Sequence, residues 1–198
     1  MTDPGEALQD LEFIKSLVLH TRVRASGMAP YFILWGFIWM VGFSSPLWLR
    51  SEWTGWLWTV LDAVGVAASI WIGIGQTRRH GPAPGPWSKI NWTFLPLMLL
   101  GVVLAFFALR GGIAPEYMPG ISVVIVGTGY LQAGVVLGRE MQVIGTWLLI
   151  LGVTVPTWFL PYQSLLFGIL GGGSLVATGF ILRRWGSRPP AASPPSAR

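Results

Sequence analysis

The stretch MQVIGTWLLILGVTVPTWFLPYQSLLFGILGGGSLVATGFIL, residues 141–182, runs for 42 residues without a charged side chain. As a single α-helix it would be about 63 Å long at 1.5 Å per residue, about twice the hydrocarbon thickness of a bilayer. We therefore expect two membrane-spanning helices in this stretch. The turn between them is predicted at Leu160-Pro161-Tyr162-Gln163, because Pro161 has no backbone N–H with which to continue a helix.

The rest of the chain has the same spacing of charges. Residues 25–49, 90–109 and 117–138 contain no charge, and residues 53–77 contain only Asp62. About 20 apolar residues cross a bilayer as a helix, and backbone groups in lipid must be hydrogen-bonded within their own segment. The sequence thus predicts an all-α integral membrane bundle with six transmembrane helices, at about 29–49, 55–77, 91–110, 118–138, 141–160 and 164–183.

The composition supports this class and excludes several others. Of the 198 residues, 53% are hydrophobic and 11% charged, whereas soluble domains carry about 25% charged residues. The 13 basic and 8 acidic residues are too few to cover a soluble globule of 21.6 kDa. The absence of cysteine excludes a disulfide scaffold, a thiolate metal site and a cysteine nucleophile.

The basic residues predict the orientation in the membrane. Eleven fall on the side of the two termini: Lys15, Arg22, Arg24, Arg78, Arg79, Lys89, Arg139, Arg183, Arg184, Arg188 and Arg198. Only Arg50 and Arg110 fall on the other side. By the positive-inside rule we expect a multi-pass protein of the cell inner (plasma) membrane with both termini cytoplasmic. An aromatic belt is predicted at the outer ends of the spans, made of Trp48, Trp53, Trp56, Trp58, Trp158 and Tyr162.

Three regions follow from this topology: residues 1–27, 28–185 and 186–198. The first is predicted to be a cytoplasmic amphipathic helix, since Leu11, Ile14 and Val18 share one apolar stripe with Leu8. This helix would lie against the inner leaflet or dock a membrane or cytoplasmic protein partner through Leu11, Ile14 and Val18. Residues 28–185 form the six-helix transmembrane domain, and the proline-rich residues 186–198 form a disordered cytoplasmic tail.

Asp62 is the one ionisable residue expected inside the membrane, at roughly 9–13 Å from the outer end of its span. The hydroxyls expected at a similar depth belong to Thr59, Ser44, Ser45 and Thr128. Gln132 lies closer to the inner side, and the outer Arg50 and Arg110 are long enough to extend inward. Two interpretations remain open: Asp62 is a proton- or cation-responsive site, or it is a structural carboxyl that hydrogen-bonds between helices.

Catalysis is not expected. Ser174 follows three glycines as an intramembrane nucleophile would, but such a serine needs a general base, and His20 and His80 fall in cytoplasmic segments. For want of histidine and cysteine we expect no metal, haem or other cofactor. The dispersed basic residues are explained by topology and by anionic lipids, so nucleic acid is not an expected partner.

Small residues four apart predict close helix packing at Gly134 and Gly138, at Gly168 and Gly172, and at Ala63 and Ala67. A homo-oligomer is one outcome that such faces allow.

The chain resembles uncharacterised bacterial multi-span inner-membrane proteins. The resemblance rests on a short cytoplasmic Leu-Glu-Phe-Ile type helix, here residues 11–14, and on a last helix that closes on a basic pair, Arg183 and Arg184. These relatives have no known activity to carry over. The sequence therefore favours a non-catalytic accessory, scaffold or sensory subunit that acts through helix packing and its N-terminal helix. The alternative is a small proton- or cation-coupled transporter or channel that uses Asp62, with Pro156 and Gly171–Gly173 breaking helices at a substrate site.

Overall fold

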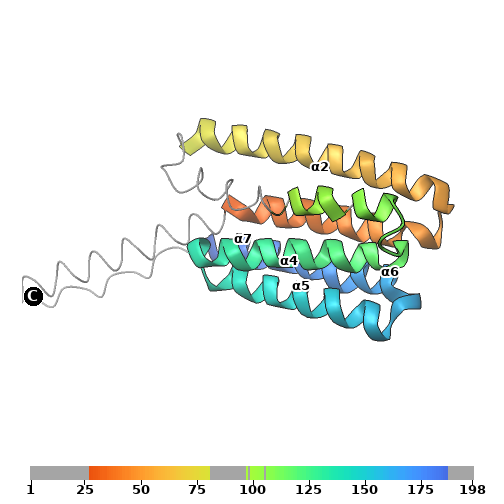
Figure 1. Ribbon diagram of the computed structural model, residues 1–198. Coiled ribbons are helices and arrows are strands. Elements are labelled where there is room, and N and C mark those ends of the chain that lie inside the picture. The colour runs from red at the N-terminus through yellow and green to blue at the C-terminus, as the bar shows by residue number, and fades with distance from the viewer. Residues whose placement is uncertain (1–26, 81–96, 98, 105, 187–198) are drawn as a thin grey trace, which may run out of the picture.

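The computed structural model describes residues 27–80, 97, 99–104 and 106–186, and these form helices without a strand among them (Figure 1). The predicted amphipathic helix, with Leu11, Ile14 and Val18, lies outside the described residues, as does the tail from residue 187 onward. The cytoplasmic location and docking role of the N-terminal helix stay predictions.

Five helices in the described part of the chain are long and apolar enough to cross a membrane. They are Gly27–Leu47 (the first span), Ser51–Arg78, Pro115–Val135, Arg139–Trp158 and Leu160–Arg184 (the last span). Their ends differ from the boundaries predicted by charge spacing by at most four residues, as at Ser51 against the expected 55. The expected span 91–110 is described only in part, as a shorter apolar helix, Leu99–Leu109. The total of six spans therefore stays a prediction.

These spans contain the following elements. The first span ends in a 3-10 turn, Ser45–Leu47, and α2 follows at Ser51–His80. A 3-10 turn, Pro115–Tyr117, leads into α4 at Met118–Leu137, and α5 occupies Arg139–Trp158. The predicted turn is confirmed as the 3-10 turn Leu160–Tyr162, after which α6 (Gln163–Leu166), a π-helical segment (Phe167–Gly172) and α7 (Gly173–Gly186) form one continuous span.

Helices α4 and α5 form a tight antiparallel hairpin, because glycines line their contact. A Cβ at Gly127 would lie 3.0 Å from both the carbonyl oxygen of Gly145 and the backbone nitrogen of Leu149, and one at Gly145 would lie 2.6 Å from the nitrogen of Leu131. Only residues without a side chain allow two backbones to approach this closely. The turn between the helices is made at Gly138, whose φ of +121° favours glycine.

The first span lies between the last span and α2. Two sets of residues on it face these two neighbours: Ile33, Gly36 and Met40 face the last span, and Trp35, Ile38 and Gly42 face α2. The sets are displaced by two positions, which is about 200° around an α-helix, so they occupy opposite sides. Gly172 of the last span approaches this helix closely, since a Cβ there would lie 2.7 Å from the carbonyl oxygen of Gly36.

An aromatic cluster centred on Phe43 joins three of the spans. The ring of Phe43 lies 5.4 Å from Trp39, 4.9 Å from Trp58 of α2 and 5.3 Å from Phe167 of the last span, measured between centroids. Trp58 therefore packs between helices, whereas Trp53 and Trp56 of the predicted belt are exposed. Trp58 points toward the first span, because it lies on the same face of α2 as Gly65 seven residues later.

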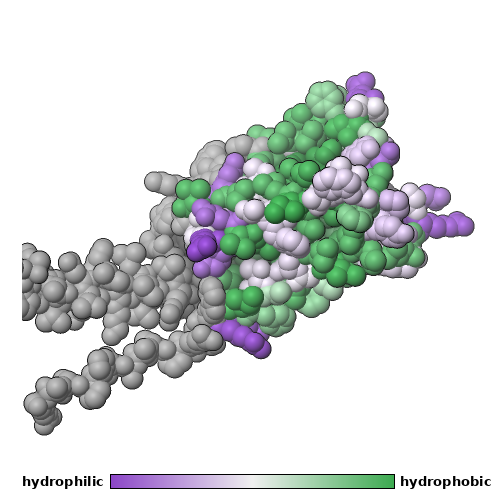
Figure 2. All heavy atoms as spheres, turned by 90° about the horizontal axis from the view of Figure 1, so that it is seen from below, coloured by the Kyte–Doolittle hydropathy of each residue, from purple (hydrophilic) through white to green (hydrophobic). Residues whose placement is uncertain are grey.

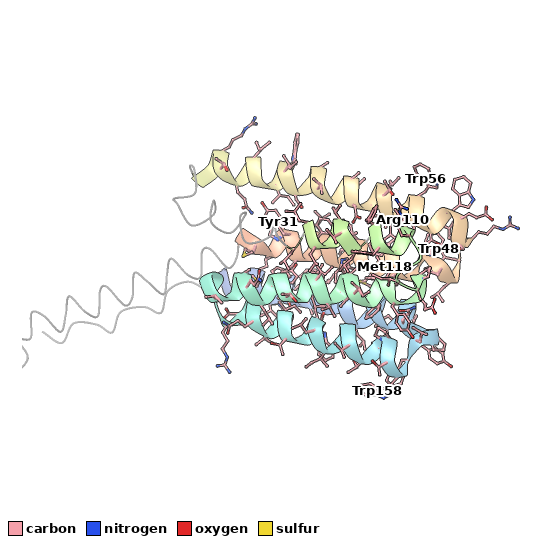
Figure 3. All side chains as sticks on the ribbon, viewed as in Figure 1. Tyr31, Trp48, Trp56, Arg110, Met118 and Trp158 are labelled. Atoms are coloured by element: carbon pink, nitrogen blue, oxygen red, sulfur yellow. The ribbon has the colours of Figure 1, made fainter. Side chains whose placement is uncertain are left out.

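The two ends of the bundle differ in the residues they carry. At one end, which we call the tryptophan end, Trp48, Trp53, Trp56 and Trp158 are exposed. Figure 3 shows three of them there together with Arg110, while Tyr31 lies toward the other end. The opposite, arginine end carries Arg78, Arg139, Arg183 and Arg184. Figure 2 shows hydrophobic side chains over the face between the ends and hydrophilic ones gathered at both ends, which is consistent with a membrane protein.

Candidate functional site

Helix α2 is the least covered of the five long helices. Only 6% of its apolar window is buried, against 33–39% in the other four. It is held to the first span by one face, where Gly65 meets Trp35 and Ile38, and where the indole Nε1 of Trp35 donates a hydrogen bond to Ser69 Oγ at 3.2 Å. In Figure 1 it forms the outermost layer of the bundle, at the top of the view. Most of its surface thus faces outward.

Asp62 lies on this uncovered helix. It shares one face with Thr59, Ala63, Val66 and Ile70, at positions i, i+3, i+4, i+7 and i+11, and all five are exposed. We call these five residues the Asp62 face.

The helix bounds place Asp62 in the middle part of α2. Because α2 begins at Ser51 and not at 55, Asp62 is eleven residues, or about 16 Å, from the tryptophan end of the helix. It is sixteen residues, or about 24 Å, from Arg78 at the other end.

The hydroxyls expected beside Asp62 are engaged elsewhere. Each donates to a backbone carbonyl three or four residues earlier in its own segment: Thr59 to Gly55 at 3.0 Å, Ser44 to Val41 at 3.1 Å, Ser45 to Gly42 at 2.7 Å, and Thr128 to Val124 at 2.9 Å. Such bonds satisfy a hydroxyl locally and direct it along its own helix. Within the described residues, the Asp62 carboxyl therefore has no hydrogen-bond or ion-pair partner.

Thr128 and Gln132 lie on α4, which belongs to a different part of the bundle. Thr128 is half-buried and Gln132 is exposed. Helix α4 packs on α5 and reaches the first span through Tyr130, whose ring stacks on Phe32 at 5.3 Å. No hydrogen bond in the described structure links either residue to Asp62, so the three intramembrane polar candidates do not form one polar cluster.

Arg50 and Arg110 are exposed at the tryptophan end. The guanidinium carbon of Arg110 lies 5.3 Å from the ring centroid of Phe106, a cation–π contact within its own helix. Among the described residues neither arginine forms an ion pair. The structure thus leaves both at the end of the bundle, and Arg50 precedes Asp62 by twelve residues, about three turns of helix.

The glycine run and Pro156, which the transporter alternative uses to break helices, are packing features here. The chain continues as a π-helical segment through Gly172, and the hydroxyl of Ser174 donates to the carbonyl of Gly171 at 2.8 Å. Helix α5 is continuous across Pro156, whose ring packs against Gly120 of α4. Both features bring helices together and neither opens a polar pocket.

A hollow of about 590 Å³ lies between the short helix, α4 and α5. Its walls are largely apolar: Leu100, Leu104, Tyr117, Ile121, Val124, Ile125, Gly152, Val153, Pro156 and Thr157. The Thr157 hydroxyl already donates to the carbonyl of Val153 at 2.6 Å. A hollow of this size accommodates a small molecule, but convergent polar groups that would orient one are missing from these walls.

Acidic, histidine and cysteine side chains do not gather in threes within the part of the chain that the structure describes. Comparison with known proteins found no matching family profile, no similar curated protein and no similar solved structure. The candidate site is therefore defined by physical chemistry alone, as the Asp62 face of α2.

Proposed function

We propose that the protein is a non-catalytic, six-span inner-membrane subunit with both termini cytoplasmic. It acts as an accessory, scaffold or sensory component through lateral helix packing and through its N-terminal helix. The observation that carries this proposal is the Asp62 face, which presents a carboxyl and a small residue on the outside of the bundle.

Placing the Asp62 carboxyl in the membrane costs free energy. An aspartate at the centre of a membrane helix costs about 2.5–3.5 kcal/mol on insertion scales, so acidic residues in spans almost always face a partner or a water-filled cavity. The hydroxyls expected beside Asp62 donate to their own backbones. A helix from outside the described bundle would supply the missing partner.

The alternative is a small proton- or cation-coupled transporter or channel. The depth of Asp62 in α2 favours it, because intramembrane carboxyls often mark ion pathways. Its weakness is the lining of such a path, since Thr128 and Gln132 are not joined to Asp62 and the hollow beside α4 is largely apolar. We therefore rank it second.

Purification of the chain with its partners distinguishes the subunit proposal from the transporter alternative. The tagged chain is extracted from its native membranes in mild detergent, and co-purifying proteins are quantified by mass spectrometry. A stoichiometric protein component, another copy of the chain included, is expected. The same purification is repeated with a variant that lacks residues 1–24. If this variant is folded but no longer co-purifies with a foreign protein, docking is assigned to the N-terminal helix.

The transporter alternative has its own test. A chain that purifies only as a monomer would contradict the subunit proposal. Proteoliposomes would then be assayed for proton or cation flux, with Asp62→Asn as the variant. Flux that this variant abolishes would establish the alternative.

A further inference from the structure

We propose that the Asp62 face of α2 binds the same face of a second copy of the chain, across a two-fold axis along the membrane normal. The inference rests on the proposed function, because it assigns the lateral packing of that subunit to a particular pair of surfaces. The occupant of the Asp62 face is the α2 helix of the second copy.

The position of Asp62 along α2 makes the face self-complementary in depth. Two copies inserted with the same orientation are parallel, so a two-fold axis along the normal brings each Asp62 opposite the other at the same depth. By contrast, the basic residues of the described part of the chain lie at the two ends of the bundle, Arg50 and Arg110 at one and Arg78 at the other. Among the described residues, a second Asp62 is thus the ionisable group that lies at the required depth.

The chemistry of the carboxyl makes it self-complementary as well. A protonated carboxyl donates through its O–H and accepts through its carbonyl oxygen, whereas an ionised one only accepts. Two Asp62 side chains that hold one or two protons between them therefore hydrogen-bond directly to each other. The pair satisfies both carboxyls without a third group.

The residues around Asp62 allow the two helices to approach. Ala63 is adjacent and exposed, and small residues at a helix contact in lipid let the backbones come close. Thr59, Val66 and Ile70 extend the same face over three turns, and their outer surfaces are uncovered in the described structure. Gly65, three residues after Asp62, contacts the first span, so the Asp62 face borders that contact. Ala63, Val66 and Ile70 lie about 100–160° around the helix from Gly65 and point away from the first span.

Single-cysteine cross-linking tests the pairing directly. The chain has no native cysteine, so each variant carries one thiol. In full-length chain expressed at low level in its native membranes, Ala63→Cys and Val66→Cys are expected to form disulfide-linked dimers under mild oxidation. The matched controls are Val64→Cys and Trp71→Cys, which are also exposed on α2 but lie on a different side of it. We expect at least several-fold more cross-linked dimer at the first two positions.

Substitution of the carboxyl then isolates its role. In the Ala63→Cys background, Asp62→Leu removes the hydrogen bond and the need for a partner, and should weaken dimerisation about 3- to 15-fold. Asp62→Asn retains a donor and an acceptor and should stay within about twofold of the parent. Leucine suits a lipid-facing position, so loss of dimer in that variant will not reflect a failure to fold.

The outcomes separate this inference from the proposed function. Equal cross-linking at all four positions would indicate random collision and would overturn the pairing. Cross-links from Ala63→Cys to a foreign protein alone would overturn the second copy as occupant, while the subunit function stands. Monomer throughout, in a chain that also purifies without any partner, would overturn both.

Discussion

A methyl group added at Gly127 should loosen the hairpin of α4 and α5, and its effect on stability follows from the backbone geometry. The added Cβ would lie 3.0 Å from the Gly145 oxygen and the Leu149 nitrogen, and 3.1 Å from Leu148 Cβ. Non-bonded carbon contacts are optimal at about 3.5–4.0 Å, so α5 must move away by up to about 1 Å. Two of the three atoms are backbone, which cannot rotate aside as a side chain would.

The expected magnitude is a balance of two terms. Overpacking of a close contact costs about 1–3 kcal/mol, while alanine gains up to about 1 kcal/mol over glycine inside a helix. Gly127→Ala should therefore lower the free energy of unfolding by about 1–2 kcal/mol. The matched control is Gly75→Ala in α2, where a Cβ would meet nothing within 4 Å, and which should be neutral or stabilising by up to about 1 kcal/mol.

Unfolding in mixed micelles with increasing SDS, followed by circular dichroism, measures both free energies. The double variant Gly127→Ala/Gly145→Ala should lose less than the sum of the two single variants. The reason is that one separation of the helices relieves both contacts. If Gly127→Ala and Gly75→Ala shift the free energy of unfolding equally and in the same direction, the close approach of α4 to α5 is refuted.

Further predictions concern the other contacts and the topology. Trp35→Phe removes the indole donor to Ser69 and should lower the free energy of unfolding by about 0.5–1.5 kcal/mol in the same SDS titration; an unchanged value would show that this bond does not hold α2. Phe43→Ala should cost about 3–5 kcal/mol, seen as a lower thermal midpoint in detergent, because three aromatic neighbours lose their contact; a midpoint equal to that of the parent would contradict the cluster. Gly172→Val should separate the last span from the first by steric conflict with Gly36, and should abolish a cross-link between cysteines placed in these two spans; a retained cross-link would speak against this close approach. A reporter active only in the cytoplasm should be active when fused to either terminus, since six spans return the chain to the same side, and activity in one fusion alone would indicate an odd number of spans.

The spacing of charges predicted most of the fold, because the cost of moving a charge into lipid dominates every other local preference in such a chain. The uncharged stretch from Met141 to Leu182 predicted two spans and the turn between them, and the structure confirms that turn at Leu160–Tyr162. Of the third expected span, the structure describes a part, as the short apolar helix Leu99–Leu109.

Which side of each helix is buried was not predictable in the same way. Lipid is as apolar as the interior of the bundle, so both faces of a span carry similar side chains. Trp56 and Trp58 are two residues apart in α2 and chemically identical, yet Trp56 is 67% exposed and Trp58 packs on Phe43. Gly65 and Gly75 lie in one helix, yet a Cβ added at the first would lie 3.0 Å from the Trp35 ring, whereas one added at the second would meet nothing within 4 Å. Only the arrangement of the helices distinguishes them.

Asp62 shows which part of the candidate site could be predicted from the sequence and which part required the structure. The sequence identifies it as the one charge within a span, and proposes nearby hydroxyls as hydrogen-bond partners. The structure shows that those hydroxyls donate to their own helices, because a serine or threonine in a helix reaches the carbonyl three or four residues earlier with ease. Because those hydroxyls are already hydrogen-bonded, the exposed Asp62 carboxyl has two ways to be stabilised. It either binds a polar partner from outside the described residues or contacts water in a polar path. A polar partner implies a dimer or a partner helix, whereas contact with water implies an ion path. The exposed position of the carboxyl on α2, away from Thr128 and Gln132, favours the dimer or partner helix.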